Sequence, residues 1–374
     1  KGASWGSHES YQIRRAVPFD QLSALMMLHF VTRQLYCGSG RVGLGERSET
    51  PGFQLSQRAD YMYAKIGLQT TFDRPIINTR DESHSTDEYR RLHVIVGDAN
   101  CMDVPEALRL GTTSLIAWLA EQAETASYDV QGLLAELELA DPVTAIHTVS
   151  HDLTLRQPLP TAAGGSLTAW QIQVRLRSAV YEVAAQVYGT DSTGEPLWPD
   201  EPTRTIMAMW GTALSDLARL AHADDDERLN MSDVAGCVEW LLKWQLLETM
   251  RRKRGVACDD SRLRAMDIAW ASLDPAHSVY RAAQSRAISL VKSDELGAAA
   301  THAPETTRAW LRAAVVQRFP KDTVAVSWSE LTVRGSDGNL HDLDISEPQW
   351  GTRSASEQTL TNATTVDDLI AAWQ

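Results

Sequence analysis

The sequence predicts an α+β protein in which a strand-rich part, a helical part and a smaller C-terminal domain follow one another. Three observations carry this prediction. Apolar and polar residues alternate in several early segments, as in half-buried strands. Apolar stripes at helical spacing fill residues 104–250. After the polar, alanine-rich stretch 297–304 the pattern changes again, so we expect one domain over residues 1–304 and a small α/β domain over 305–374.

The first predicted strand spans residues 4–15. Alternation places His8, Ser10, Gln12 and Arg14 on one face and Glu9, Tyr11 and Ile13 on the other. The histidine therefore belongs to a polar face, where it is available to a ligand. A half-exposed strand with no chemical role explains the same pattern.

Residues 19–36 follow a helical spacing, with Met26 and Phe30 as expected core residues. The glycine-rich run 37–45 comes next. It lacks the lysine of a phosphate-binding loop and the strand-to-helix context of a dinucleotide fingerprint. We therefore expect a flexible turn or lid there.

A third feature is the segment 74–82, in which Asn78 and Arg80 share a face beside Ile77. An arginine fork donates two hydrogen bonds to phosphate or carboxylate oxygens in a geometry that lysine does not match. For a single arginine, the simpler interpretation is a structural salt bridge with one of the nearby carboxylates, Asp60, Asp81 or Glu82.

The strand predicted over residues 90–98 carries the most distinctive pattern. Arg91, His93 and Ile95 share one face, and the opposite face is apolar, with Leu92, Val94 and Val96. An arginine beside a histidine, backed by an apolar face, suits a phosphate group and its metal ion. A hydrogen-bonded core histidine remains the alternative interpretation.

The central part of the chain is predicted to be helical. Residues 104–124 form one, and clean apolar stripes mark others at 172–187, at 210–221 and at 234–241, the last with Ser232 as its expected N-cap. These stripes indicate core packing and no cofactor site. In the C-terminal part we expect a helix over 307–318, strands over 324–328 and 340–345 around a 335–338 turn, and a final helix opened by the capping box of Thr365 and Asp368.

Composition narrows the class of protein. The formal net charge of −14 argues against non-specific nucleic-acid binding. The four cysteines form no CxxC pair, so we expect neither a zinc site nor a disulfide framework, and a reducing, cytoplasmic setting. No apolar run reaches the length of a membrane span. The sequence starts at Lys1 without a leader pattern, and we expect a fragment, a processed product or one chain of a pair.

Several motifs in the same order resemble the family of the deamidase of the prokaryotic ubiquitin-like protein Pup, also called the depupylase, and its relative the Pup ligase. The motifs span nearly the whole chain: 2–9 (GASWGSHE), 31–34 (VTRQ), 51–60 (PGFQLSQRAD), 76–82 (IINTRDE), 89–98 (YRRLHVIVGD), 307–309, 327–328 and 347–353. The segments 1–4 and 39–54 are more similar to the deamidase branch than to the ligase branch.

The resemblance implies a glutamine-synthetase-like fold, with a curved antiparallel sheet that holds ATP and Mg²⁺ and is backed by helices. By motif it implies these roles: His8 and His93 as metal ligands, Ser10 and Arg91 as nucleotide contacts, Arg58 and Arg80 as catalytic groups that hold phosphate oxygens and developing charge, and Trp328 as part of the nucleotide pocket. The implied reaction hydrolyses an amide at the C-terminal residue of Pup, either the side-chain amide of glutamine or the isopeptide bond to a lysine of a pupylated protein.

The resemblance also implies an acidic strand ahead of the aligned motifs, with metal-binding glutamates and a catalytic aspartate. No aspartate of this chain is assigned that role, and Asp81 and Asp98 are not promoted to it. We expect a separate companion polypeptide to supply the segment. Ser10 stands where the family usually has asparagine.

Two other functions remain open. One is a Pup ligase, which forms the isopeptide bond and consumes ATP. The other is a non-catalytic module that binds Pup or a nucleotide. Phosphate release that depends on Pup and a lysine substrate distinguishes the ligase from the hydrolase, and binding without product identifies the module.

Overall fold

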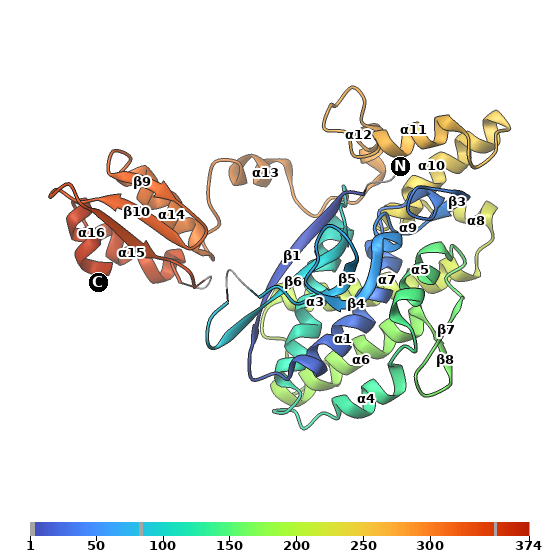
Figure 1. Ribbon diagram of the computed structural model, residues 1–374, viewed down its shortest axis with the longest axis horizontal. Helices are drawn as coiled ribbons and strands as arrows, with labels where there is room; N and C mark the ends of the chain where they lie inside the picture. Colours follow the sequence, from blue (N-terminus) through green and yellow to red (C-terminus); the bar gives the residue numbers. More distant parts are fainter. Residues whose placement is uncertain (1–3, 82–84, 348–349, 374) are drawn as a thin grey trace. The chain divides into compact units, whose positions relative to one another are not determined.

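The computed structural model describes residues 4–81, 85–347 and 350–373. The chain divides into two compact units, residues 1–290 and residues 291–374. The division lies ahead of the boundary expected after residue 304, and the assignment of residues 291–304 to the larger domain stays a prediction. Most strands of the first unit precede most of its helices, although α1 and α2 follow β1 directly, so its architecture is α+β (Figure 1).

A four-stranded sheet in the order β1-β6-β5-β4 organises the first unit. Its strands are β1 (Gly6–Arg14), β4 (Met62–Gly67), β5 (Arg74–Asn78) and β6 (Tyr89–Asp98). The β1–β6 and β5–β6 pairs are antiparallel, as the resemblance implied, whereas the β4–β5 pair is parallel. Two short hairpins accompany the sheet: β2 (Arg41–Leu44) with β3 (Thr50–Gln54), and β7 (Pro158–Pro160) with β8 (Ser166–Thr168).

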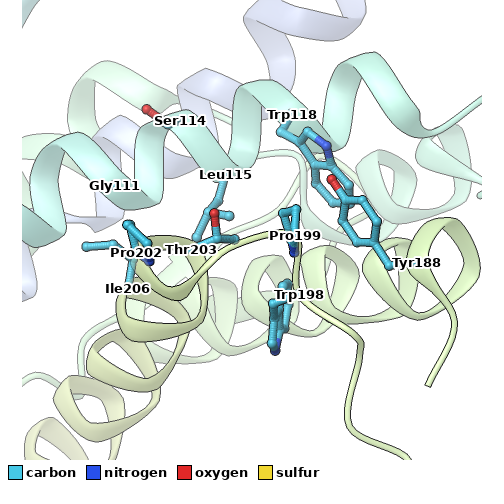
Figure 2. A pocket seen from close by; sticks show the side chains of 10 residues that line it. All are labelled: Gly111, Ser114, Leu115, Trp118, Tyr188, Trp198, Pro199, Pro202, Thr203 and Ile206. Carbon is cyan, nitrogen blue, oxygen red and sulfur yellow. The ribbon is translucent and has the colours of Figure 1, made fainter. Parts of the chain in front are cut away.

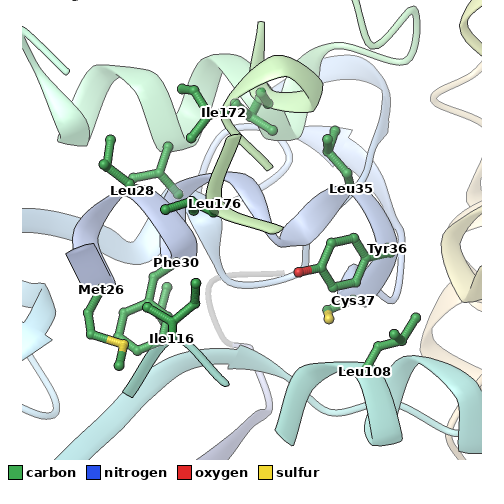
Figure 3. Close-up of a cluster of buried hydrophobic side chains, with 14 of the residues drawn as sticks. Met26, Leu28, Phe30, Leu35, Tyr36, Cys37, Leu108, Ile116, Ile172 and Leu176 are labelled. Carbon is green, nitrogen blue, oxygen red and sulfur yellow. The ribbon is translucent and has the colours of Figure 1, made fainter. Parts of the chain in front are cut away.

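Helices pack together and against the sheet to form the core of this unit. They are α1 (Phe19–Thr32), α2 (Gln34–Cys37), α3 (Asp103–Gln122), α4 (Val130–Leu137), α5 (Pro142–His151), α6 (Ala169–Tyr188) and α7 (Glu201–His222). Figure 3 shows where side chains of α1, α3 and α6 meet. Met26 and Phe30, expected in the core, are 0% and 2% exposed, and Ile116 and Ile172 are fully buried in the same cluster.

The remaining helices of the unit are α8 (Asp225–Asn230), α9 (Ser232–Ala235), α10 (Glu239–Arg254), α11 (Ser261–Ala269) and α12 (Val279–Ala283), with single 3-10 turns η1 (Ala59–Tyr61) and η2 (Gln284–Arg286). The single helix expected over 234–241 is wrong, because the chain breaks between α9 and α10. At the break, the carbonyl of Gly236 accepts a hydrogen bond from the backbone N–H of Ile288. A long-range backbone contact therefore replaces the helical one.

The expected flexible lid at 37–45 is also wrong. Ser39 is fully buried, and the Lys243 ammonium donates a hydrogen bond of 2.7 Å to the carbonyl of Gly40. A Cβ on Gly38 would lie 2.3 Å from the backbone oxygen of Leu55. The glycine therefore permits close approach of two backbones and does not mark a flexible segment.

The second unit is a three-stranded antiparallel sheet, in the order β11-β10-β9, with helices around its own core. Its elements are α13 (Ser293–Ala299), α14 (Arg308–Arg318), β9 (Thr323–Val326), β10 (Glu330–Arg334), β11 (Leu340–Asp344), α15 (Arg353–Asn362) and α16 (Val366–Trp373). The capping box is confirmed, since the backbone N–H of Thr365 donates to Asp368 over 2.8 Å and that of Asp368 donates to the Thr365 hydroxyl over 3.2 Å.

Candidate active site on the face of β1 and β6

Pairing of three strands brings several of the predicted polar residues to one face of the sheet. Ser10 lies opposite His93 and Gln12 lies opposite Arg91 in the β1–β6 ladder. On the other side of β6, Asn78 lies opposite the same histidine. Directly opposite residues of paired strands have their side chains on the same face. The face therefore combines residues from segments that are far apart in the sequence.

His8 and His93 meet on this face. Nδ1 of His8 lies 3.3 Å from Nε2 of His93, and the ring centroids are 5.2 Å apart. Burial, followed by the charge of Arg91, lowers the pKa of His93 to about 4. Burial and then nearby arginines also lower the pKa of His8. Both imidazoles are therefore neutral near neutral pH, which is the form that binds metal ions.

Arginine side chains surround the histidine pair. Nε of Arg91 donates a hydrogen bond of 3.1 Å to the Ser10 hydroxyl. Burial, followed by the charge of Arg80, lowers the pKa of Arg91. Burial, followed by the charge of Arg74, lowers the pKa of Arg58. Neighbouring positive charges thus lower the pKa values of these arginines. The face therefore carries a positive potential, which complements a polyphosphate.

Two hydrogen bonds that Arg58 donates, one from its side chain and one from its backbone, hold it at the site. Its Nε donates to the carbonyl of Ile95 over 2.9 Å, and its backbone N–H donates to Oδ1 of Asp98 over 3.1 Å. A Cβ on Gly6 would lie 2.5 Å from the guanidinium. Glycine at that position therefore makes room for the arginine, which is only 4% exposed.

Asp98 is the anchor for two loops. Its carboxylate also accepts hydrogen bonds from the backbone N–H and hydroxyl of Ser39, the hydroxyl of Ser56 and the backbone N–H of Gln57. The residue is 3% exposed. A buried carboxylate with this many donors holds the loop that carries Arg58 against the end of β6.

Arg80 lies at the exposed end of the same face, where its backbone N–H donates to the Asn78 side chain over 2.9 Å. The salt-bridge alternatives find other partners: His151 lies 2.7 Å from Asp60, and Arg15 lies 2.6 Å from Asp81. Glu82 lies outside the described residues. The Arg80 guanidinium therefore forms no ion pair with Asp60 or Asp81, the two described carboxylates that were considered from the sequence.

Trp328 belongs to the second unit. Its side chain is 68% exposed, and the Arg312 guanidinium lies 5.3 Å from the centroid of its ring. The strand expected through this residue ends earlier, because β9 stops at Val326.

The histidine pair fits one divalent cation in two respects. Two nitrogens bound to one metal at about 2.1 Å would be about 3.0–3.4 Å apart in octahedral or tetrahedral geometry, close to the observed separation of His8 Nδ1 and His93 Nε2. Both rings are neutral. Over residues 4–81, 85–347 and 350–373, no group of three or more His, Cys, Asp or Glu residues is placed to hold a metal. Further ligands would therefore be nucleotide oxygens, water or groups from another segment.

A recess elsewhere in the first unit offers no comparable chemistry. It has a volume of about 250 Å³ and lies between α3 and the start of α7 (Figure 2). Trp118 stacks on Tyr188 there, with ring centroids 5.6 Å apart. Tyr188 is its single titratable lining residue, and none of the predicted site residues lines it. The recess therefore does not support catalysis.

Sequence reasoning missed the residues that hold the site together. Asp98 was considered only as a catalytic aspartate and rejected, and Glu9 was placed only on the back face of the first strand. Arg33, in the motif 31–34, and Arg109, in the predicted helix 104–124, were given no role, although both contact Glu9. One available signal was the presence of charged residues within otherwise apolar helical segments, since buried charges require partners.

Known proteins resemble this chain over most of its length. The model of the Pup-ligase protein family matches residues 1–332. The depupylase of Acidothermus cellulolyticus is 35% identical, with 100% of this chain and 70% of the relative covered. The Pup deamidase/depupylase of Mycolicibacterium smegmatis is 36% identical (95% and 66% covered), and the Pup–protein ligase of Jonesia denitrificans is 34% identical (88% and 67% covered). The chain thus spans about two thirds of the length of these relatives.

Solved structures give the same result. The Pup ligase PafA in complex with ADP superposes with a TM-score of 0.76 at 28% identity, over 96% of this chain and 73% of that one. The complex between Pup and PafA gives 0.76 at 27% identity, over 96% and 68%. These matches confirm the predicted glutamine-synthetase-like α+β fold. Where the structure describes the chain, no helix is both long and apolar enough to cross a membrane. The chain belongs to the Pup-ligase family, whose members include both depupylases and Pup ligases.

Proposed function

We propose that this chain provides the nucleotide and metal face of an ATP- and Mg²⁺-dependent hydrolase, which deamidates the C-terminal glutamine of Pup and cleaves the isopeptide bond of pupylated proteins. The observation that carries the proposal is the neutral pair of His8 and His93 within a cluster of arginines. Similarity to curated depupylases over nearly the whole chain supports the hydrolase over other nucleotide-dependent enzymes.

The site residues predicted from the sequence receive the following roles. His8 and His93 hold the cation through neutral nitrogens. Ser10 and Arg91, joined by their hydrogen bond, contact the nucleotide. For Trp328, in the second unit, the nucleotide contact is a prediction that rests on the resemblance alone.

Arg58 and Arg80 bind phosphate oxygens and stabilise the negative charge that develops on the amide oxygen during attack. When bound, Mg²⁺ would supply positive charge that stabilises this developing anion, and ATP would supply an ordered phosphate surface. Imidazole nitrogens suit transition metals better than Mg²⁺, so Mn²⁺ is a sensitive probe of the same ligands. The group that activates the nucleophile is not assigned to this chain. We propose that the acidic strand implied by the resemblance supplies it, together with carboxylates that complete the metal site.

A Pup ligase is the second candidate. It is favoured by the ligases among the relatives, at 31–34% identity, and by the similarity to PafA in complex with ADP. The same arginines would then stabilise a transferring phosphoryl group.

The cytoplasmic setting stays a prediction from the four free cysteines.

Mass spectrometry of glutamine-terminated Pup tests the proposal. Pup is incubated with the chain, ATP and Mg²⁺, with and without a peptide segment that carries the acidic strand implied by the resemblance. We expect conversion of the terminal amide to the acid when the segment is present. Arg58→Ala abolishes conversion, whereas Arg254→Ala, an exposed arginine at the end of α10, leaves it unchanged.

Two results would overturn the proposal. Isopeptide formation between glutamate-terminated Pup and a lysine substrate, with phosphate release and no deamidation, would identify a ligase. Binding of Pup or ATP without any product, with the segment present, would identify a binding module.

A further inference from the structure

Glu9 lies between His8 and Ser10 on β1, and its side chain points to the opposite side of the sheet. Its carboxylate is almost fully buried. The guanidinium of Arg33, at the end of α1, donates to both of its oxygens, over 2.6 and 3.0 Å. The Tyr11 hydroxyl donates to it over 2.5 Å. Three donors thus fix this carboxylate from behind the candidate active site.

A second arginine, Arg109, contacts Glu9 and also forms hydrogen bonds with β1 and β6. Nε of Arg109, on α3, lies 4.0 Å from Glu9. Its other nitrogens donate to the Ser7 hydroxyl on β1 over 2.9 Å and to the carbonyl of Asp98 on β6 over 2.7 Å. A Cβ on Gly97 would lie 2.8 Å from the Glu9 carboxylate, so the strands close tightly around this contact.

The pairing of β1 with β6 is irregular at this position. Ser7 lies opposite Gly97 and Glu9 lies opposite Val94, so the register shifts at His8. β-Bulges of this kind re-aim side chains and occur next to active sites. The carbonyl of Ile95, within the irregular stretch, accepts its hydrogen bond from Arg58 on the front face. The irregularity is therefore held from both sides of the sheet.

We infer that Glu9 is a positioning residue, which fixes the rotation of β1 so that His8 and Ser10 face His93 and Arg91. Side chains of consecutive strand residues point in opposite directions, so anchoring one sets the direction of its neighbours. Three hydrogen bonds to the Glu9 carboxylate restrict its movement. Such restriction matters because the side chains of a functional site must be placed within about 0.5 Å of their working positions. The inference rests on the proposed metal and nucleotide site, because it concerns the placement of that site's ligands.

Binding of Mn²⁺ and ATP to the full chain tests this role. Glu9→Gln keeps the shape of the side chain and removes its charge. We expect the affinity for Mn²⁺ in the presence of ATP, measured by electron paramagnetic resonance, to fall about 10-fold, as for other residues that support metal ligands. ATP binding without metal, measured by calorimetry, should change less than about 2-fold, because the arginines of the face remain.

Leu217→Ala is the matched control. Leu217 is fully buried on α7, so its truncation lowers Tm without touching the sheet. It should leave both affinities unchanged, which separates positioning from general destabilisation. If Glu9→Gln does not fold, Arg33→Lys, which keeps the charge but loses the two-pronged donation, replaces it.

The outcomes separate this inference from the function on which it rests. Wild-type Mn²⁺ affinity in Glu9→Gln or Arg33→Lys overturns the positioning role. If Mn²⁺ binding by the wild-type chain is unaffected by His8→Ala and His93→Ala, the proposed metal site itself is wrong.

Discussion

Replacement of Asp98 tests how strongly one buried carboxylate organises the candidate site. Asp98→Ala removes the acceptor for five hydrogen bonds. The hydroxyls of Ser39 and Ser56 can reorient, and the backbone N–H of Arg58 keeps the Ser56 oxygen at 3.0 Å as a second acceptor. The backbone N–H groups of Ser39 and Gln57 have no such replacement among the contacts of the described residues. The variant therefore leaves two donors without acceptors, a buried one at Ser39 and a part-buried one at Gln57.

The magnitude follows from these two donors. A buried donor without its acceptor costs about 1–3 kcal/mol and a part-buried one costs less, so we expect Asp98→Ala to lower the free energy of unfolding by about 2–5 kcal/mol. Total stabilities are about 5–15 kcal/mol, so this is a large loss. Asp98→Asn keeps one acceptor oxygen. With that oxygen facing Ser39 and Gln57, the loss should be only about 1–3 kcal/mol.

Urea denaturation followed by tryptophan fluorescence measures both variants. The midpoint should fall in the order wild type, Asp98→Asn, Asp98→Ala, with the slope m unchanged. ATP affinity should fall in the same order, because the Asp98 carboxylate holds the backbone of Arg58. A loss below about 0.5 kcal/mol for Asp98→Ala, which is typical of surface substitutions, would refute the reasoning.

Three further predictions concern other parts of the first unit. Lys243→Met should lower the free energy of unfolding by about 3–5 kcal/mol, because the buried Asp267 carboxylate loses the ammonium that lies 2.5 Å from it. Adding Asp267→Leu should restore most of that loss in a double-mutant cycle. An equal loss in the single and the double variant would argue against a stabilising Lys243–Asp267 ion pair. Gly38→Ala should cost about 1–3 kcal/mol in urea denaturation, since the new Cβ would lie 2.3 Å from a backbone oxygen, and an unchanged midpoint would show that the loop relaxes. Because the folded-state pKa of His93 is about 4, below its ordinary value of 6.5, the imidazole stays neutral as the pH falls through 6.5. The affinity for Mn²⁺, measured without ATP so that protonation of the γ-phosphate does not contribute, should therefore stay level from about pH 8 to about pH 6 and fall towards pH 4, and a fall centred near 6.5 would contradict the lowered pKa.

Local patterns identified the elements that carry the candidate site. Alternation along residues 4–15 and 90–98 was enough to assign His8 with Ser10, and His93 with Arg91, to polar faces, because the period of a strand depends on the backbone alone. The pairing of the two strands lay beyond such patterns. It depends on contacts across about eighty residues, which local periodicity does not encode.

Other features depended on contacts that a short segment does not contain. The glycines near Gly38 look flexible in the sequence, yet they lie buried where Asp98 and Lys243 hold the loop. The apolar stripe over 234–241 looks like one helix, yet a contact of Gly236 with residue 288 breaks it. In both cases a distant partner satisfied backbone groups that local structure would otherwise have paired.

The sequence by itself determined the α+β class, the core helices, and the residue types available for phosphate and metal, since these follow from periodicity and side-chain chemistry. Only the tertiary structure decided that His8 and His93 lie 3.3 Å apart, that both are neutral, and that Glu9 and Asp98 hold the face from behind and from its end. The physical reason is that burial and charge proximity arise when distant segments pack together, and these two effects set both the pKa values and the geometry of the site.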